Sequence, residues 1–507
     1  MSAMPPKLVL CVIDAMAPEM LERAIAAGTT PVLEQLIERG SYVPDCVAAF
    51  PSVTPVCAAS IVTGKAQDAH HIPAMNWYHR EEERYVEYGS SFRSAQRFGI
   101  ARQLTDTVYN MNRAHLAQET LTVFESLDDA DVRTAGTTYL MYRGRHRHEP
   151  QRDTALTRVA ATLMRHAVLG PRELFYADIF ASRRTGCRSN LGMPGVRDRH
   201  SGCVSSYLVE HDLFDFLLLS LPDNDWVSHK RGPEAQLVSL AQADLQLARV
   251  MNAGGGVESF LEEHAVIVMA DHSQAPVTAE IALQDELDEL GVLGPARSSE
   301  GSRSEEPRIA VCPSQRAAMV YALRESERDA MRASVAARSL AIEGIDLVMW
   351  LERDAHDAPR EGVIASPEHG ELRFAPGGAA LDARGGSWNL EGALEVLHAR
   401  VDAGRLLTPL YPDALARAWA ALTCPTSGEV LLSATPGYEF IDWGRQAHVG
   451  GGSHGSLHAS DSLGALLFSG VELPEPEPEQ WAIRDVASLV RAHFGVTEHA
   501  RVVSAGP

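Results

Sequence analysis

The sequence predicts an α/β fold built on a doubly wound, mainly parallel sheet flanked by helices. Short, continuous apolar runs alternate with segments of helical periodicity, which is the pattern of strands buried on both faces. Several of these runs end directly in an acidic residue, as strand ends at a ligand-binding sheet edge often do. Two long stretches break the alternation, so we expect them to be insertions into this core.

The candidate strands are short runs of apolar residues. Leu8–Ile13 reads LVLCVI, and its β-branched and apolar residues are typical of a strand with no exposed face. The complete set, in chain order, is Leu8–Ile13, Ser41–Ala49, Phe214–Leu221, Ala265–Ala270, Gly428–Ala434 and Leu463–Ser469.

Helix signals separate these runs. Pro31–Arg39 has helical spacing and stops at Gly40, a common residue after a helix end. Thr54 precedes Pro55 and an apolar segment, which predicts a helix with Thr54 as its N-cap residue. A further helix is expected to end near Val250, and Trp481–Phe494 is amphipathic.

The predicted domain organisation is a discontinuous core with two inserted subdomains. Residues 1–80, 206–290 and 428–507 form the core, and residues 81–205 and 291–427 form the insertions. The first insertion is rich in arginine, because residues 133–199 contain 13 Arg, no Lys and five acidic residues, a net charge of +8. The second insertion contains a hairpin-like stretch, Gly362–Phe374.

Composition excludes several classes of function. With 45 basic and 67 acidic residues the chain carries a formal charge of −22, so we expect no nucleic-acid polymer and no anionic membrane as a partner. The longest apolar runs fall far short of the roughly 20 residues of a membrane helix. The first apolar run is also too short for the core of a signal peptide. Seven scattered cysteines without a CxxC pair indicate a reducing compartment, with cysteine used as a small hydrophobic residue, and hence a cytoplasmic protein.

Acidic, histidine and hydroxyl residues recur at the ends of the predicted strands. Asp14 follows the first strand, and Asp271 and His272 follow Ala265–Ala270. The remaining candidates are Thr54 at its helix N-terminus, Asp225 and His229 in the loop after Phe214–Leu221, and His454 and His458 before Leu463–Ser469.

Each of these residues alone has an ordinary explanation, such as a helix cap or a surface pair. With His458 left aside, they offer together three aspartates, three histidines and one hydroxyl at one sheet edge, a ligand mixture that divalent metals such as zinc prefer. Seven ligands divide into two sites, and two neighbouring metals form the clamp used for in-line displacement at phosphorus. The helix N-terminus at Thr54 would add N–H groups suited to a phosphoryl group.

Six segments of the chain, in order, resemble motifs of the alkaline phosphatase superfamily, most closely its nucleotide pyrophosphatase/phosphodiesterase branch. The segments are VIDAMAPEML (12–21), FPSVTPVCAASIVTG (50–64), HHIPAMNWY (70–78), LPDNDWVSHKRGP (221–233), MADHSQAPV (269–277) and GGSHG (451–455). Together they anchor the core, which is roughly half of the chain, and the two insertions show no match that can be placed.

The resemblance implies an alkaline-phosphatase-like fold and two divalent metal ions, with Zn²⁺ expected and Mn²⁺ or Fe as alternatives. One metal would be held by Asp14, Asp271 and His272, with Thr54 bridging, and the other by Asp225, His229 and His454. Thr54 would form a phosphothreonine intermediate, and Asn76 would hydrogen-bond the phosphoryl group of a small phosphorylated substrate. Ser273 stands where the family usually has Gly, and the Pro-Val-Cys after Thr54 departs from the phosphodiesterase pattern.

Arg143 and Arg145 are candidates for gripping a remote anionic part of the substrate. The alternative is that these arginines pair with acidic residues of the core. His458 is a candidate substrate or metal neighbour, with a plain surface histidine as the alternative.

Several other functions stay open. One is cleavage of a carbon–phosphorus bond, as in the related phosphonoacetate hydrolases, which need lysines over the substrate carboxylate; Lys65 is the only lysine near the Thr54 segment. A second is phosphomonoester hydrolysis. A third, of another class, is a non-catalytic protein that binds a ligand on the same scaffold.

Overall fold

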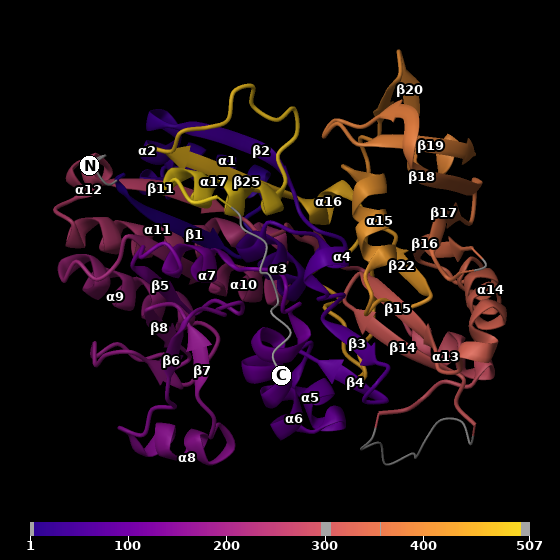
Figure 1. Cartoon of the computed structure of the whole chain (residues 1–507), viewed down its shortest axis with the longest axis horizontal. Coiled ribbons are helices and arrows are strands. Elements are labelled where there is room, and N and C mark those ends of the chain that lie inside the picture. Colours follow the sequence, from indigo (N-terminus) through magenta and orange to yellow (C-terminus); the bar gives the residue numbers. More distant parts are fainter. Residues whose placement is uncertain (1–4, 296–305, 355, 498–507) are drawn as a thin grey trace.

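An eight-stranded sheet forms the centre of the protein in a computed structural model that describes residues 5–295, 306–354 and 356–497 (Figure 1). The strand order is β2-β25-β11-β1-β10-β5-β8-β9. The five strands from β11 to β8 are parallel, which confirms the mainly parallel sheet. The bounds are β1 Lys7–Ile13, β2 Ser41–Val47, β5 Thr134–Thr137, β8 Glu173–Tyr176, β9 Phe180–Ala181, β10 Phe216–Leu221, β11 His264–Met269 and β25 Leu463–Ser469.

Helices cover both faces of this sheet because the side chains of its buried strands alternate between two apolar layers. Leu8, Leu10 and Val12 of β1 pack in the layer that contains α3, α7 and α17, whereas Val9 and Cys11 pack in the other. The helices of the first layer are α3 Thr54–Thr63, α7 Val123–Asp128 and α17 Val486–His493. Those of the second are α1 Pro18–Ala26, α2 Pro31–Arg39, α9 Arg197–Glu210, α11 Gln236–Ala253 and α12 Val257–Glu263.

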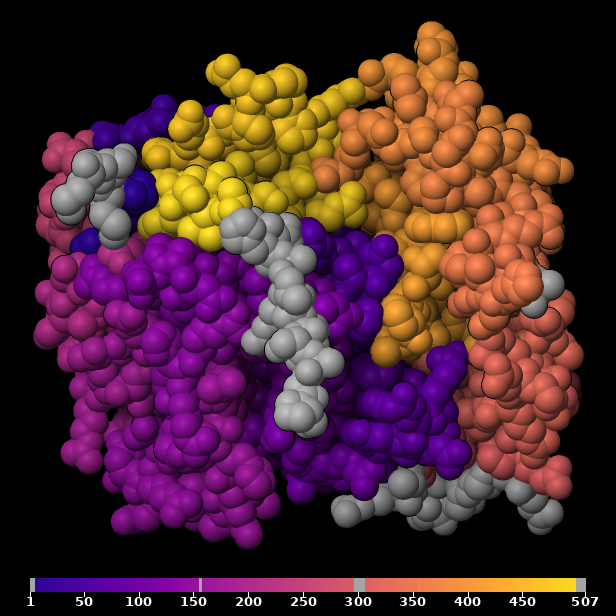
Figure 2. Space-filling view, in the orientation of Figure 1, coloured from indigo at the N-terminus to yellow at the C-terminus, as the bar shows by residue number. Residues whose placement is uncertain are grey.

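A second, nine-stranded sheet lies beside the first, with α14 and α15 against it (Figures 1 and 2). Its order is β14-β15-β22-β16-β17-β18-β21-β20, with β19 paired to β18. The predicted hairpin is confirmed, because β17 and β18 pair antiparallel. The bounds are β14 Ile309–Ser314, β15 Ala317–Ala322, α14 Arg328–Ser339, β16 Ile345–Arg353, β17 Pro359–Ser366, β18 Gly370–Leu381, β19 Ser387–Gly392, β20 Arg400–Asp402, β21 Arg405–Leu407, α15 Ala414–Thr423 and β22 Val430–Ala434.

The prediction for Gly428–Ala434 as a strand of the core sheet is wrong. This run forms β22, which pairs antiparallel with β15 and β16 of the second sheet. A buried central strand has the same apolar pattern in either sheet, so periodicity alone cannot assign it to one.

The first insertion is more than a cap over the core. Its β5 and β8 extend the central sheet, in parallel with β10 and with each other. The strand β5 reads TAGT, which is too short and too polar to stand out as a buried run. Other elements of this insertion are β4 Arg84–Glu87, α5 Phe92–Phe98, α6 Ile100–Thr105, a π-helix at Asp106–His115, β6 His146–His148, α8 Ala155–Leu163 and β7 Val168–Gly170.

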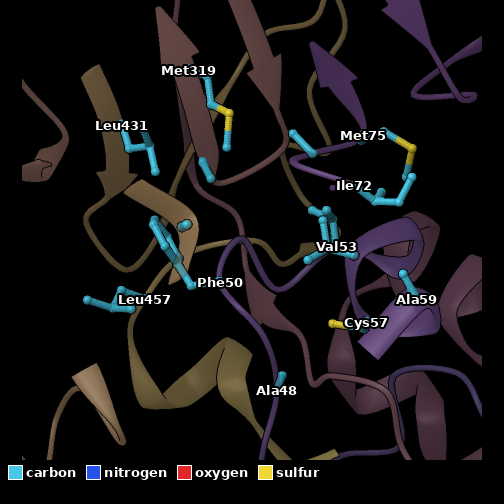
Figure 3. Packing of buried hydrophobic residues seen from close by; sticks show 14 of the residues in the cluster. Ala48, Phe50, Val53, Cys57, Ala59, Ile72, Met75, Met319, Leu431 and Leu457 are labelled. Atoms are coloured by element: carbon cyan, nitrogen blue, oxygen red, sulfur yellow. The ribbon is translucent and has the colours of Figure 1, made fainter. Parts of the chain in front are cut away.

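The two sheets share one continuous apolar core. Figure 3 shows Val53 and Cys57, at the start of α3, in the same cluster as Met319 of β15 and Leu431 of β22. The helix that begins at Thr54 is therefore held by both parts of the molecule.

Two of the cysteines depart from the sequence-based expectation. Cys187 and Cys203 form a disulfide with their Cα atoms 5.9 Å apart, whereas the other five cysteines are free and buried. The expected use of cysteine as a small hydrophobic residue is therefore wrong for these two residues. They are sixteen residues apart in the sequence, and they meet because the loop that carries Cys187 folds back onto α9. Among the described residues, no helix combines the length and apolarity needed to cross a bilayer. The cytoplasmic location stays a prediction.

Candidate active site

The first group of candidate metal ligands lies at the ends of two neighbouring strands. Asp14 follows β1 directly and Asp271 lies two residues after β11, and these strands are parallel partners in the sheet. His272 Nε2 lies 3.6 Å from Asp14 Oδ1 and 3.5 Å from Asp271 Oδ2. All three side chains are buried.

The second group comes from a helix and a loop. Asp225 and His229 are one turn apart on α10 (Asp223–Arg231), so the sequence-based placement in a loop is wrong although the pair itself is formed. His454 follows β24 (Gly452–Ser453). Asp225 Oδ1 lies 3.3 Å from His229 Nε2 and 3.5 Å from His454 Nε2. The rings of His454 and His272 stack with centroids 3.7 Å apart, so the two groups adjoin.

Backbone carbonyls fix the orientation of all three histidine rings. The Nδ1 atom of His272 lies 3.1 Å from the Ser273 carbonyl oxygen. The Nδ1 atom of His229 lies 2.8 Å from that of Gly452, and the Nδ1 atom of His454 lies 2.6 Å from that of Ser52. Since a carbonyl can only accept, each Nδ1 carries the proton and each Nε2 of a neutral ring turns its lone pair toward a carboxylate. Lone pairs facing carboxylates repel unless a cation lies between them.

The carboxylates lead to the same conclusion. Burial and the nearby charges of Asp271 and Asp225 raise the pKa of Asp14, and burial also raises the pKa of Asp271. Asp14 Oδ1 is buried with no hydrogen-bond partner among the described residues. Two sets of ligand atoms, Asp14–Asp271–His272 and Asp225–His272–His454, each lie within 4.8 Å of one another. The described side chains thus include two overlapping groups, both with His272, that could hold a divalent cation.

Thr54 is the first residue of α3 and is half-buried beside this cluster. It is not the N-cap residue expected from the sequence, because the helix starts one residue earlier, after Val53, and the side chain caps nothing. Instead, Thr54 Oγ1 lies 3.3 Å from His272 Nε2. Val56 and Cys57 both donate to the Val53 carbonyl and Pro55 has no N–H, so of these first four helical residues only Thr54 keeps its N–H for a substrate.

Asn76 begins β3 (Asn76–His79) and is buried. Its side-chain amide donates to the Val86 carbonyl at 3.0 Å, and its backbone N–H donates to Ser314 Oγ at 3.1 Å. The Asn76 Oδ1 atom is buried without a partner in the described part of the chain. An amide oxygen only accepts, so a contact of Asn76 with a phosphoryl oxygen would have to come from its Nδ2 group, and that contact stays a prediction.

The structure does not bring Arg143, Arg145 or His458 into the cluster. Arg143 is buried, pairs with Glu125 at 3.0 Å and donates to backbone carbonyls. Arg145 pairs with Glu125 and Asp129. These ion pairs lie within the first insertion, whereas the alternative predicts partners among the acidic residues of the core. His458 accepts from the Ser460 N–H at 3.1 Å and so caps the short helix α16 (Ala459–Ser462).

Three further polar residues near the site had no assigned role in the sequence. Gln274 donates to the carbonyl of Asp225 and to its carboxylate, and its position two residues after His272 was the available signal. Gln315 Nε2 lies 3.5 Å from His229 Nε2, and it comes from the second insertion, where no motif marks it. Burial and the charge of Asp271 raise the pKa of Tyr139, whose buried hydroxyl has no hydrogen-bond partner among the described residues.

A family model shows which known proteins the chain is similar to in sequence. The chain matches the family model described as type I phosphodiesterase / nucleotide pyrophosphatase over residues 8–366, a range that includes Asp14, Thr54, Asp225, His229 and Asp271 but ends before His454. No curated protein matches the sequence.

Two solved structures of phosphonoacetate hydrolase from Sinorhizobium meliloti 1021 are similar in fold. The complex with phosphonoformate shares 18% identity at a TM-score of 0.55, and the complex with phosphonoacetate shares 17% at 0.55; each comparison covers 96% of both chains. At these identities the likeness concerns the fold alone, and it confirms the alkaline-phosphatase-like architecture.

Proposed function

The chain belongs to the type I phosphodiesterase / nucleotide pyrophosphatase family, and on this premise we propose that it hydrolyses phosphodiester or pyrophosphate bonds of a small phosphorylated substrate. Thr54 is the nucleophile and two divalent cations, with Zn²⁺ preferred, are the cofactors. The observation that carries the proposal is the 3.3 Å contact of Thr54 Oγ1 with His272 Nε2, the atom that also faces Asp14 and Asp271 of the first ligand group.

The six candidate metal ligands would form two cation sites beside Thr54. Asp14, Asp271 and His272 would hold one cation next to Thr54, and Asp225, His229 and His454 would hold the other. The bound cations would lower the pKa of the Thr54 hydroxyl and offset negative charge on the departing oxygen.

The reaction proceeds in two displacements. Thr54 Oγ1 attacks phosphorus in line, the bond from phosphorus to the leaving group breaks, and water then hydrolyses the phosphothreonine. The Thr54 N–H and Asn76 hold oxygens of the transferred phosphoryl group in place.

Cleavage of a carbon–phosphorus bond is a second candidate, favoured by the fold shared with phosphonoacetate hydrolase. A carboxylate-bearing substrate of that kind needs a cationic side chain near the cluster. Lys7 pairs with Asp212 and Lys230 lies over the Trp226 ring, so the contacts of these two lysines are with other residues. Ester or anhydride hydrolysis is the better supported activity, because the matching family model describes phosphodiesterases and nucleotide pyrophosphatases.

The nucleophile is tested with Thr54→Ala. Turnover of bis-p-nitrophenyl phosphate, p-nitrophenyl phosphate, a dinucleotide and phosphonoacetate is measured with defined metals, next to metal content per chain. We expect loss of turnover by at least about 10³-fold, because the covalent route disappears, while the metal content stays near that of the wild type.

The matched control is Thr63→Ala, at the far end of the same helix, where the hydroxyl donates to the Ala59 carbonyl and accepts from the Lys65 N–H. Full activity of Thr54→Ala would remove Thr54 as the nucleophile. Preferred hydrolysis of phosphonoacetate by the wild type would replace the ester or anhydride assignment with the carbon–phosphorus one.

A further inference from the structure

A strained turn of the second insertion reaches the second ligand group. Gln315 lies between β14 and β15 with φ +63°, a left-handed conformation that glutamine rarely adopts. Its backbone is fixed on both sides, because Phe440 N–H donates to the Gln315 carbonyl at 2.8 Å and Arg316 N–H donates to the His454 carbonyl at 2.9 Å. Strain of this kind is retained where the surrounding structure demands the position, and often at functional sites.

The side-chain amide of Gln315 loses its contact with His229 Nε2 when that nitrogen binds a cation. Its Nε2 lies 3.5 Å from His229 Nε2, and its Oε1 is buried without a partner among the described residues. His229 Nδ1 already donates to Gly452, so Nε2 offers the only lone pair of the ring. A cation on that lone pair leaves the partly buried Gln315 amide without a partner among the described residues, and its buried Oε1 atom in particular needs an outside partner.

A second polar group is held at the same place. The His448 ring lies over the His229 ring with centroids 4.1 Å apart. Its Nδ1 bonds at 2.8 Å to Glu439, a carboxylate that is 2% exposed and also accepts from Ser453 Oγ at 2.8 Å. The side chain of His448 remains 32% exposed, and because Nδ1 donates to Glu439, the Nε2 atom of the neutral ring is left to accept from a ligand hydroxyl.

The direction of displacement decides which part of the substrate meets these groups. In an in-line reaction the attacking and leaving oxygens lie on opposite sides of phosphorus. In the proposed assignment Thr54 lies beside the cation that Asp14, Asp271 and His272 would hold, so the leaving oxygen would depart toward the second group, which contains His229. Gln315 and His448 both adjoin His229.

We propose that Gln315 and His448 form a leaving-group subsite that selects substrates whose leaving group carries oxygens beyond the departing atom: one that accepts from Gln315 Nε2 and a hydroxyl that donates to His448 Nε2, as a phosphorylated ribose provides. This inference rests on the proposed function and adds the class of leaving group. Both side chains are substrate-contact residues, with Glu439 as the positioning residue for His448.

Binding is measured first, because it does not need turnover. Thr54→Ala protein loaded with Zn²⁺ is titrated calorimetrically with a dinucleotide pyrophosphate and with bis-p-nitrophenyl phosphate. Adding either Gln315→Ala or His448→Ala is expected to weaken binding of the dinucleotide about tenfold, which is the effect of one lost hydrogen bond. This loss of affinity should be at least fivefold larger than the loss of affinity for the aryl diester. The same substitutions are then made in the protein that retains Thr54. There, kcat/KM should fall more for the dinucleotide than for the aryl diester.

The Zn²⁺ affinity distinguishes a residue that contacts the substrate from a residue that only orients His229. We expect Gln315→Ala to keep the Zn²⁺ affinity of the metal-free protein within about twofold, whereas a residue that orients a metal ligand changes it about 10–100-fold. Gln103→Ala and His211→Gln are matched controls, since these side chains contact Thr107 and Tyr207.

Equal losses for both substrates, no loss, or a large fall in zinc affinity would each overturn the subsite. If the wild type hydrolyses nothing while the selective loss of binding persists, the proposed function fails and the subsite stands. If turnover is present but the binding of both substrates responds alike, only the subsite fails.

Discussion

At the scale of single residues, a buried ion pair holds the loop that delivers His454. Arg316 and Asp461 are both fully buried and bond directly to each other. Asp461 also accepts from the Ser456 N–H at 2.9 Å, and Arg316 N–H donates to the His454 carbonyl. The pair thereby ties the turn that carries Gln315 to the glycine-rich segment around His454.

We predict that Arg316→Met destabilises the protein by about 3–5 kcal/mol, because it leaves Asp461 as a buried, unpaired charge. The measurement is the midpoint of urea unfolding. The double variant Arg316→Met, Asp461→Leu should recover most of the loss, since it buries no charge at all. A single variant as stable as the wild type would show that this pair contributes nothing to the fold.

At the scale of elements, the helix α2 is capped by a residue from another helix. Thr30, its own N-cap residue, makes no capping bond. Asp244 of α11 accepts from the N–H groups of Val32 and Leu33 at 3.3 and 2.8 Å instead. Burial raises the pKa of Asp244 to about 6, although these two N–H bonds act in the opposite direction.

We predict that Asp244→Ala lowers the free energy of unfolding by about 1–2 kcal/mol at pH 7.5, because two helical N–H groups lose their acceptor. Since the folded-state pKa is raised above the unfolded value, the native carboxyl binds its proton more readily than the unfolded chain does. Wild-type stability relative to Asp244→Ala should therefore increase as the pH falls from about 7 to about 4.

The matched control is Gln242→Ala, an exposed position on the same helix. Urea unfolding of the three proteins between pH 4 and pH 7.5 provides the test. A stability difference between wild type and Asp244→Ala that narrows toward acid pH would contradict the assigned direction of the pKa shift.

At the scale of the whole molecule, the candidate metal site joins segments that are distant in the sequence. Its ligands follow β1 and β11, lie on α10, and follow β24, and the α3 helix adds Thr54. Two sheets meet along the apolar cluster beneath α3 (Figure 3). Bound cations would therefore stabilise the folded chain as a unit, because the unfolded chain has no such site.

We predict that removing metal with EDTA lowers the thermal midpoint and that added Zn²⁺ restores it. A cation present at 100 times its dissociation constant contributes about 2.7 kcal/mol per site. Asp14→Ala, which loses one carboxylate of the first group, should bind fewer metal ions per chain by elemental analysis. An unchanged midpoint after EDTA, with under one metal per chain beforehand, would argue against a metal centre.

Much of the fold and part of the site could be predicted from local patterns. Buried parallel strands must be apolar over several consecutive residues, so β1, β10, β11 and β25 are visible in the sequence. Because neighbouring parallel strands end at one edge, Asp14, Asp271 and His272 were also expected to lie together, and they do. Local patterns failed for β5, which is short and polar, and for β22, whose apolar run fits either sheet.

By itself the sequence determined the fold class, the types of candidate ligand and their place at strand ends, because these depend on residues close together in the chain. Only the tertiary structure decided that backbone carbonyls orient the three histidines, that Arg143 pairs with Glu125, and that Gln315 reaches His229. Those contacts join residues far apart in sequence, and they depend on how two sheets pack, which no local pattern encodes.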